Sequence, residues 1–342
     1  MRVAMYYSND DIRLEEATTP KPGPGEILVR IQASGICGTD VMEWYRKRQA
    51  PSVLGHEITG EIAAIGQGVE RFTVGDRVMA THHVPCNECH HCRSGHASVC
   101  ELMRRTRFDP GGFAEFVRVA KVNVDSGTFA LPDTLSFAEG SFTEPLACVV
   151  RAQRHAGGPT NGTTLVMGSG VAGLLHLQLA KATGADKVAV TDVNAERLAL
   201  ALCMGADVAL DAHENVPARI REINAGRLAD LVIVCTGARP AIEQAFECVE
   251  RGGTLLFFAT TAEGVKVPIP LYEMWHNEVR LVTSYAASPE DLAAAIELLR
   301  AGTVKVDQLI SHRLPLEEAG KGFRLVANAQ DSLKVIIEPQ RP

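Results

Sequence analysis

Long apolar runs are absent from this sequence of 342 residues. No stretch approaches the roughly 18 uninterrupted apolar residues that a membrane-spanning helix requires. Residues 1–15 carry scattered charges and lack the apolar segment of a secretory signal peptide. Basic residues are not in excess, because 41 acidic residues outnumber 34 lysines and arginines and the net charge is −7. Nucleic acids and anionic membranes attract basic surfaces, so we expect neither partner. Because the sequence shows no signal peptide or membrane span, we expect a cytoplasmic protein.

Aromatic side chains are scarce, at 5% of the residues, and the chain has neither an internal repeat nor a low-complexity segment. The apolar share of 46% and the charged share of 22% are still those of a globular protein. The length suits two domains of about 100–200 residues each. The nine cysteines are odd in number, and four of them lie in one short loop. In a large chain this pattern indicates metal binding in a reducing compartment rather than a disulfide framework.

The first third of the chain is rich in glycine and in short β-like runs. Strands are predicted over Ile27–Ala33, Gly60–Ile65, Arg77–Ala80 and Phe113–Val119. Turns that contain proline and glycine separate these runs, which is typical of a twisted, partly closed β domain. Ser136 is expected to cap a helix that carries Phe142–Arg154.

From Asn161 onward, strand and helix patterns alternate. Buried strands are predicted over Thr164–Met167, Val188–Thr191, Leu231–Cys235, Leu255–Ala259 and Val279–Thr283, with helices such as Ala195–Met204 and Ala238–Val249 between them. Repeated βα units predict a doubly wound α/β sheet. A later helix, Asp291–Ala301, leads to a strand over Leu333–Glu338 that is expected to return to the first domain.

A glycine-rich turn links the first of these strands to a helix. The turn reads Gly168-Ser169-Gly170-Val171-Ala172-Gly173, and a helical run follows it to Ala182. Such glycines allow a tight turn, close approach of the backbone to a pyrophosphate, and close packing of helix on strand. We predict that Gly168, Gly170, Val171 and Gly173 bind a dinucleotide at the helix N-terminus.

An acidic residue completes this fingerprint. Asp192 ends the next strand, nineteen residues after Gly173, where a carboxylate accepts hydrogen bonds from ribose hydroxyls and repels a 2′-phosphate. NAD is therefore favoured over NADP, although Arg197 lies nearby and is able to attract that phosphate. Cys235 and Thr236 follow the strand Leu231–Cys235 and are expected to border the nicotinamide half of the cofactor.

Four cysteines form a compact metal-binding pattern. Cys86, Cys89, Cys92 and Cys100 have the spacing C-x2-C-x2-C-x7-C, which supplies four thiolates for a closed tetrahedral zinc site. An iron–sulfur cluster is the main competing interpretation. We predict a structural zinc that orders a loop with little apolar material of its own.

A second metal site is indicated by residues that are far apart in the chain. Cys37 lies in a CGTD segment, His56 and Glu57 lie in a GHE segment, and Glu144 precedes Pro145. A thiolate, an imidazole and a carboxylate make a three-ligand zinc site whose fourth position is open to substrate. Singly, Cys37 also suits a small core residue, His56 a turn histidine, and Glu144 a charge at a helix start.

Taken in order along the chain, these motifs resemble the zinc-dependent medium-chain dehydrogenase family, and Glu144-Pro145-Leu146-Ala147 looks most like its sorbitol and threonine dehydrogenase branch. The resemblance covers nearly the whole length. It implies a GroES-like, partly closed β-barrel catalytic domain (1–153 and 288–342) and a Rossmann domain for NAD (154–287). It also implies two zincs per subunit, oxidation of an alcohol by hydride transfer to NAD, and a homodimer or homotetramer.

The resemblance gives roles to individual residues. Thr39 matches the hydroxyl that begins the family's proton relay, but Met42 stands where the relay commonly continues to a histidine. Cys37 and His56 match constant zinc ligands, while Glu57 and Glu144 compete for the remaining position.

The substrate is less defined by these motifs. A secondary alcohol such as a polyol, cyclitol or sugar is favoured, and a charged alcohol such as a sugar phosphate or 3-hydroxy amino acid is the alternative. The basic turn at residues 46–48 bears on this choice, but we expect it to be solvated. A zinc-loop protein that binds nucleic acid and a zinc-free quinone reductase are more distant alternatives.

Overall fold

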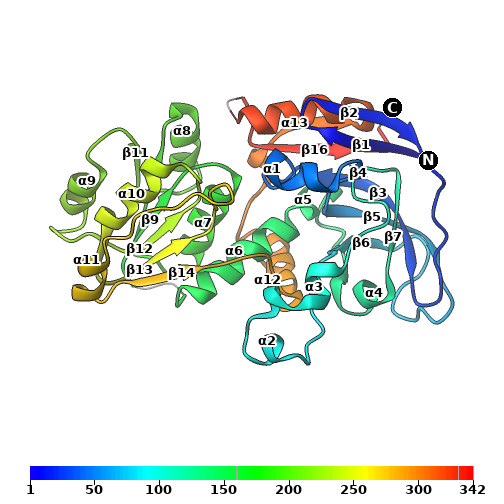
Figure 1. Ribbon diagram of the computed structural model, residues 1–342, viewed down its shortest axis with the longest axis horizontal. Coiled ribbons are helices and arrows are strands. Elements are labelled where there is room, and N and C mark those ends of the chain that lie inside the picture. The colour runs from blue at the N-terminus through cyan, green and yellow to red at the C-terminus, as the bar shows by residue number, and fades with distance from the viewer. Residues whose placement is uncertain (159–160, 330, 342) are drawn as a thin grey trace. The chain divides into compact units, whose positions relative to one another are not determined.

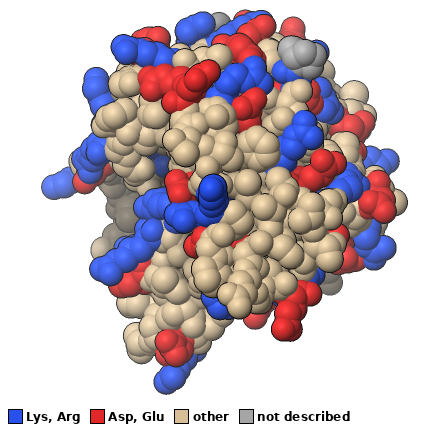
Figure 2. All heavy atoms as spheres, turned by 90° about the vertical axis from the view of Figure 1, so that its right-hand side faces the viewer, with Lys and Arg blue, Asp and Glu red and all other residues tan. Residues whose placement is uncertain are grey.

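The computed structural model describes residues 1–158, 161–329 and 331–341 and forms two compact units (Figure 1). The first comprises residues 1–147 and 286–342, and the second comprises residues 148–285. Sequence reasoning placed these divisions after residues 153 and 287. None of the described helices has the length and apolarity needed to cross a membrane. On the face in Figure 2, acidic and basic side chains are interspersed.

The first unit is built on β-structure that is antiparallel except where β15 pairs in parallel with β16. Its larger sheet has the order β15–β16–β3–β5–β6–β8, and β7 also pairs with β3. These strands are β3 (Ile27–Gly35), β5 (Glu57–Ile65), β6 (Arg77–Ala80), β7 (Phe116–Val119), β8 (Thr128–Ala130), β15 (Ile310–Pro315) and β16 (Lys334–Glu338). A smaller sheet joins β2 (Asp11–Glu16), β1 (Arg2–Ser8) and β4 (Ser52–Val53). The pairing of β16 with β3 brings the C-terminal strand back to the N-terminal domain, as the sequence predicted.

Alternating apolar side chains explain the pairing of β3 with β5. Ile27, Val29 and Ile31 of β3 share one core with Ile58 and Ile62 of β5. Where these strands cross closely, a Cβ at position 60 would lie 2.1 Å from the carbonyl oxygen of residue 30, so only glycine fits there.

Short helices connect the strands of this unit. They are α1 (Glu43–Arg46), α2 (His90–Arg93), α3 (Glu101–Arg105), α4 (Lys121–Gly127), α5 (Phe137–Gly140), α12 (Pro289–Arg300) and α13 (Ala319–Asn328), while α6 (Thr143–His155) carries residues of both units. The expected role of Ser136 was wrong in one respect. Ser136 caps the separate helix α5, in a capping box with Glu139, and not the longer helix α6. A capping signal marks a helix start but says little about how far that helix continues.

The second unit is a parallel sheet with the order β11–β10–β9–β12–β13–β14. Its strands are β9 (Thr163–Met167), β10 (Lys187–Asp192), β11 (Val208–Asp211), β12 (Ala229–Val234), β13 (Val249–Phe257) and β14 (Arg280–Thr283). In chain order this is the 3-2-1-4-5-6 arrangement of dinucleotide-binding folds, so the predicted doubly wound sheet is confirmed. The strand β11 was not among the predicted runs.

Helices cover the parallel sheet. They are α7 (Val171–Ala182), α8 (Ala195–Cys203), α9 (Val216–Ile223), α10 (Arg239–Cys248) and α11 (Leu271–His276). Residues of α9, α10 and α11 share one apolar core with alternate residues of the strands. The neighbours β9 and β12 begin the two halves of the sheet, and ligands bind at the carboxyl ends of the strands at such a switch point.

Candidate metal centres and cofactor site

Three of the predicted catalytic residues meet at the end of β3 and the start of β5. Cys37 follows β3, His56 precedes β5, and Glu57 is its first residue. One ligand atom from each lies within 4.8 Å of the other two. The strand register explains this meeting, because Gly35 pairs directly with Glu57. A side chain at position 35 would displace the carboxylate, since its Cβ would lie 2.1 Å from Glu57 Oε2.

A buried carboxylate orients the histidine. Asp40 is fully buried, and its Oδ1 lies 3.4 Å from His56 Nδ1 and 3.2 Å from Arg46 Nη2. The backbone N–H of Cys37 donates to Asp40 Oδ2 at 3.1 Å. Burial alone would raise the pKa of Asp40, but His56 and Arg46 hold it below its usual value. Burial likewise opposes the charge on His56, yet Asp40 and Cys37 raise the pKa of His56 well above its usual value. Asp40 therefore acts as the outer partner that fixes the ring of a ligand histidine.

Thr39 is held between a thiol and a guanidinium. Its Oγ1 donates to Cys37 Sγ at 3.3 Å and accepts from Arg46 Nη2 at 3.2 Å. The expected solvated basic turn is therefore wrong for Arg46, whose side chain is only 14% exposed, while Lys47 and Arg48 are exposed. The family's relay commonly continues from the Thr39 hydroxyl to a histidine. In this structure the side chain of Arg46 lies next to the hydroxyl instead.

Glu57 has a buried cationic partner from the far end of the chain. Lys334 of β16 forms an ion pair with Glu57 Oε2 and also donates to the carbonyl oxygen of Ile36 at 3.3 Å. Burial would lower the pKa of Lys334, but the charges of Glu57, Cys37 and Glu144 raise it. Glu144 is buried near this lysine, outside the group of three ligand atoms found among the described residues.

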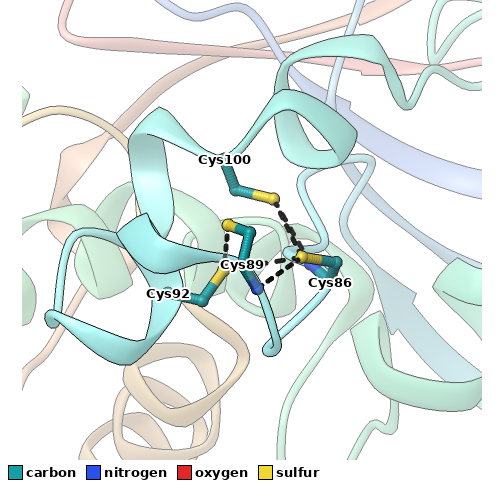
Figure 3. A group of neighbouring side chains, drawn as sticks. All are labelled: Cys86, Cys89, Cys92 and Cys100. Atoms are coloured by element: carbon teal, nitrogen blue, oxygen red, sulfur yellow. Dashed lines mark hydrogen bonds between the residues drawn. The ribbon is translucent and has the colours of Figure 1, made fainter.

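The four-cysteine loop closes around one point, as Figure 3 shows. The sulfur atoms of Cys86, Cys89, Cys92 and Cys100 all lie within 4.8 Å of one another, and the sulfurs of Cys89 and Cys92 are 3.4 Å apart. Zn–S bonds of about 2.3 Å imply sulfur separations of about 3.8 Å in a tetrahedron, so the loop fits zinc. The N-terminus of α3 helps to ionise one thiol. Burial would raise the pKa of Cys100, but backbone N–H groups of residues 86, 102 and 103 lower it to about 6.

The glycine-rich turn has the geometry that its sequence requires. Gly168 has φ +97°, and a Cβ at Gly173 would lie 1.8 Å from the carbonyl oxygen of Gly168. Gly170 stands at the N-cap and Val171 begins α7. Only glycine at position 173 allows the helix to begin so close to the turn. The N–H groups at the start of α7 are therefore available to a phosphate at this turn.

Asp192 lies beside this turn at the end of β10. Its two carboxylate oxygens accept the backbone N–H groups of Ser169, at 2.7 Å, and Asn194, at 2.9 Å. Arg197 is on the same side, because its Nη1 lies 3.9 Å from the place of a Cβ at Gly170. The carboxylate thus holds the glycine-rich turn in place.

Cys235 and Thr236 follow β12 at the switch point. The backbone N–H of Cys235 donates to the carbonyl oxygen of Met167, and Thr236 Cβ lies 3.5 Å from the place of a Cβ at Gly168. Burial raises the pKa of the Cys235 thiol, so this side chain is neutral.

Comparison with known proteins identifies the family. A family model described as alcohol dehydrogenase GroES-like domain matches residues 23–130, and one described as zinc-binding dehydrogenase matches residues 172–301. The chain is 31% identical to sorbitol dehydrogenase of Gallus gallus over 339 residues, which covers 96% of this chain and 93% of the relative. The chain belongs to the zinc-containing medium-chain alcohol dehydrogenase family. It is a zinc-binding oxidoreductase that acts on CH–OH groups and is related to the sorbitol and polyol dehydrogenases.

Solved structures of this family resemble the chain over nearly its full length. A zinc-binding dehydrogenase of Sinorhizobium meliloti 1021 with NADP bound is 30% identical, with a TM-score of 0.87 and 99% of each chain covered. Galactitol-1-phosphate dehydrogenase of Escherichia coli is 28% identical, with a TM-score of 0.84, and the match covers 99% of this chain and 100% of that one. The family, the GroES-like fold and the Rossmann fold expected from the sequence are therefore confirmed.

Sequence reasoning missed several residues of this medium-chain dehydrogenase. Asp40 lies in the CGTD segment and was available to it, whereas Lys334 offered no local signal. His82 and His83 lie beside His56: the rings of His56 and His82 are 5.5 Å apart, and those of His82 and His83 are 3.7 Å apart. Two adjacent histidines just before a four-cysteine loop were the only hint of this second cluster.

Proposed function

We propose that this dehydrogenase oxidises a secondary alcohol of a polyol, cyclitol or sugar-like compound with NAD, using one catalytic and one structural zinc per subunit. The observation that carries the proposal is the convergence of Cys37, His56 and Glu57 within 4.8 Å. Three protein ligands leave a fourth position for substrate, whereas the four cysteines leave none.

The donor set fits zinc in its chemistry as well as its spacing. A thiol, an imidazole and a carboxylate are the ligands that zinc accepts, and Glu57 Oε1 is buried without a hydrogen bond to any described residue. Bound zinc supplies Lewis acidity toward the substrate hydroxyl, and bound NAD accepts the hydride. Glu144, buried near Lys334, is the second carboxylate available to this centre.

The surrounding residues orient this centre and receive the proton. Asp40 fixes the ring of His56, and Lys334 fixes the carboxylate of Glu57. Thr39 Oγ1 is the hydroxyl beside the thiol and is the first acceptor for the substrate proton. Arg46 cannot take the proton onward, because a guanidinium stays protonated in proteins. We therefore propose that the proton passes from Thr39 to water.

The cofactor proposal rests on Gly168, Gly170, Val171 and Gly173, with Asp192 favouring NAD. A carboxylate beside the turn repels a 2′-phosphate. Arg197 lies close to the same turn, so weaker use of NADP is expected. Cys235 and Thr236 are proposed to border the nicotinamide from the end of β12.

Self-association is proposed through the edge of the parallel sheet. Among the described strands, β14 pairs only with β13, so its other edge is open. Large apolar side chains are exposed here: Leu271, Tyr272, Trp275, Leu281 and Tyr285 are 41–73% exposed. Because exposed strand edges invite pairing, a second copy is proposed to cover this edge, giving a homodimer or a homotetramer.

Metal counting and a substrate panel test the proposed function. The purified chain should hold two zincs by mass spectrometry and should form NADH from neutral polyols such as sorbitol, more efficiently than it forms NADPH. Cys37→Ser should lose one zinc and turnover while its circular dichroism spectrum is unchanged. A chain without zinc that reduces quinones with NADPH would refute the proposal, as would salt-sensitive DNA binding without affinity for a dinucleotide.

A further inference from the structure

Arg46 uses two of its three guanidinium nitrogens in hydrogen bonds to neighbouring residues. Its Nε donates to the carbonyl oxygen of Thr39 at 3.0 Å, and its Nη2 donates to Thr39 Oγ1 and Asp40 Oδ1, each at 3.2 Å. The guanidinium carbon lies 4.9 Å from the ring centre of Tyr45, which covers one face. Nη1 has no hydrogen bond within the described chain, and the side chain is 14% exposed. The guanidinium is therefore fixed in place, and the two N–H groups of Nη1 remain available to a ligand.

A pair of histidines lies beside the ligand histidine, within reach of the charge of Arg46. His82 meets the ring of His56 edge-on, at 5.5 Å between centres and 72° between planes. His83 lies against His82 at 3.7 Å. The Nδ1 atom of His82 is buried and has no hydrogen-bond partner in the described part of the chain. Buried polar atoms are almost always paired, so a bound molecule is a natural partner for this nitrogen.

Two arginines lie near these histidines. Arg46 and Arg107 are both close enough to His82 and His83 to act on them electrostatically. A positive charge in this position attracts an anion. Two buried carboxylates of this region have cationic partners, since Asp40 is paired with Arg46 and Glu57 with Lys334. The third, Glu144, also lies near Lys334.

We propose that the substrate is a secondary alcohol that also carries a phosphate or carboxylate group, which Arg46 binds through Nη1 while His82 hydrogen-bonds a neighbouring hydroxyl. This inference rests on the proposed dehydrogenase function and names the substrate class of the same site. Arginine suits the task because it stays charged in proteins and its Nη1 offers two N–H groups to the oxygens of either anion. Its three bonds to Thr39 and Asp40 hold the guanidinium in position before the substrate arrives, which reduces the entropy lost on binding.

Three six-carbon compounds separate the possible sources of the anion: sorbitol, sorbitol 6-phosphate and gluconate. The zinc-loaded enzyme should have a KM at least tenfold lower for one anionic compound than for sorbitol, and this advantage should shrink as salt is added. Arg46→Gln should raise the KM for that compound at least tenfold more than it raises the KM for sorbitol. Arg46→Lys should keep part of the preference. Arg48→Gln removes a neighbouring exposed arginine and should leave all three KM values within twofold.

Binding gives a second readout that does not depend on turnover. With NADH present, the preferred anionic compound should raise the melting temperature of the wild-type protein more than that of Arg46→Gln. Equal melting shifts in the two proteins would overturn the inference, and so would a fall in kcat that is the same for all three compounds. The latter result would mean that Arg46 only supports Asp40 and His56. Oxidation of sorbitol without any preference for an anion would leave the proposed function standing, whereas failure to oxidise all three compounds would count against it.

Discussion

Lys334 Nζ and Glu57 Oε2 form an ion pair in which the side chains are only 4% and 0% exposed. Lys334→Met would leave the carboxylate of Glu57 buried without its cation. Breaking such a pair by removing one partner costs about 3–5 kcal/mol, so the free energy of unfolding should fall by this amount. Denaturant titration measures this loss.

The same substitution should lower the affinity of the three-ligand site for zinc. Metal analysis after dialysis would show this as a lower zinc content. Lys321→Met is a matched control, because Lys321 pairs with Glu318 on the exposed surface. Surface pairs contribute about 0–1 kcal/mol, so the control should change little. Equal losses in the two variants would contradict a special role for Lys334.

The four-cysteine loop should depend on its metal for order. Cys89→Ser should reduce the zinc content from two to one per chain and expose the loop to proteolysis, because the loop has no other bonds as strong as zinc–thiolate bonds. Limited proteolysis and metal analysis measure these effects. Cys203→Ser replaces an exposed cysteine outside the loop and should retain both zincs. Retention of two zincs by the Cys89 variant would rule out the proposed ligand set.

The two metal sites differ in how far sequence could predict them. Cys86, Cys89, Cys92 and Cys100 lie within fifteen residues of one another, so their spacing alone indicated a tetrahedral site. Cys37, His56 and Glu57 come together only through the pairing of β3 with β5, and they were recognised through resemblance to a family. The spacing of residues along the chain does not reveal that strand pairing brings these three side chains together.

Two contacts of the catalytic region lay beyond sequence reasoning. Lys334 reaches Glu57 because β16 pairs with β3 across nearly the whole chain, and no local pattern marks a lysine for burial. Arg46 was expected in solvent with its basic neighbours, but Thr39 and Asp40 draw it inward by hydrogen bonds. The parallel sheet, by contrast, was predictable because its strands are continuous apolar runs.

His176 of α7 should make the enzyme less stable in acid. It is fully buried, its Nδ1 lies 3.1 Å from Gln153 Nε2, and burial lowers its pKa from 6.5 to about 3. Below pH 6.5 His176 becomes protonated in the unfolded chain, whereas in the native protein it stays neutral down to about pH 3. Stability is therefore lost as the pH falls through this window, by about 2 kcal/mol at pH 5.

Melting temperatures at pH 7 and pH 5 test this contribution. His176→Gln removes the titrating group and should show a smaller drop between the two pH values than the wild-type protein shows. His276→Gln removes an exposed histidine and should show the wild-type drop. Identical drops in all three proteins would mean that His176 does not contribute.

Asp192 should determine the choice of cofactor. Asp192→Asn keeps an oxygen for the turn but removes the charge that repels a 2′-phosphate, so the ratio of kcat/KM for NAD to that for NADP should fall by about tenfold or more, equivalent to about 1.4 kcal/mol. Asp211→Asn is the matched control, because Asp211 ends the neighbouring strand β11 opposite Asp192. An unchanged ratio in the Asp192 variant would show that another residue sets the preference.

The open edge of β14 should mediate self-association. Leu281 of this strand is 41% exposed, and Leu281→Glu would place a charge in the proposed contact between two copies. Because burying an unpaired carboxylate is costly, the variant should have the mass of a smaller assembly by light scattering, without a change in its circular dichroism spectrum. Leu14 is 45% exposed on β2, and Leu14→Glu adds the same charge at a different strand. That control should keep the wild-type mass, since charge alone does not dissociate an assembly. If both variants or neither dissociate, β14 is not the interface.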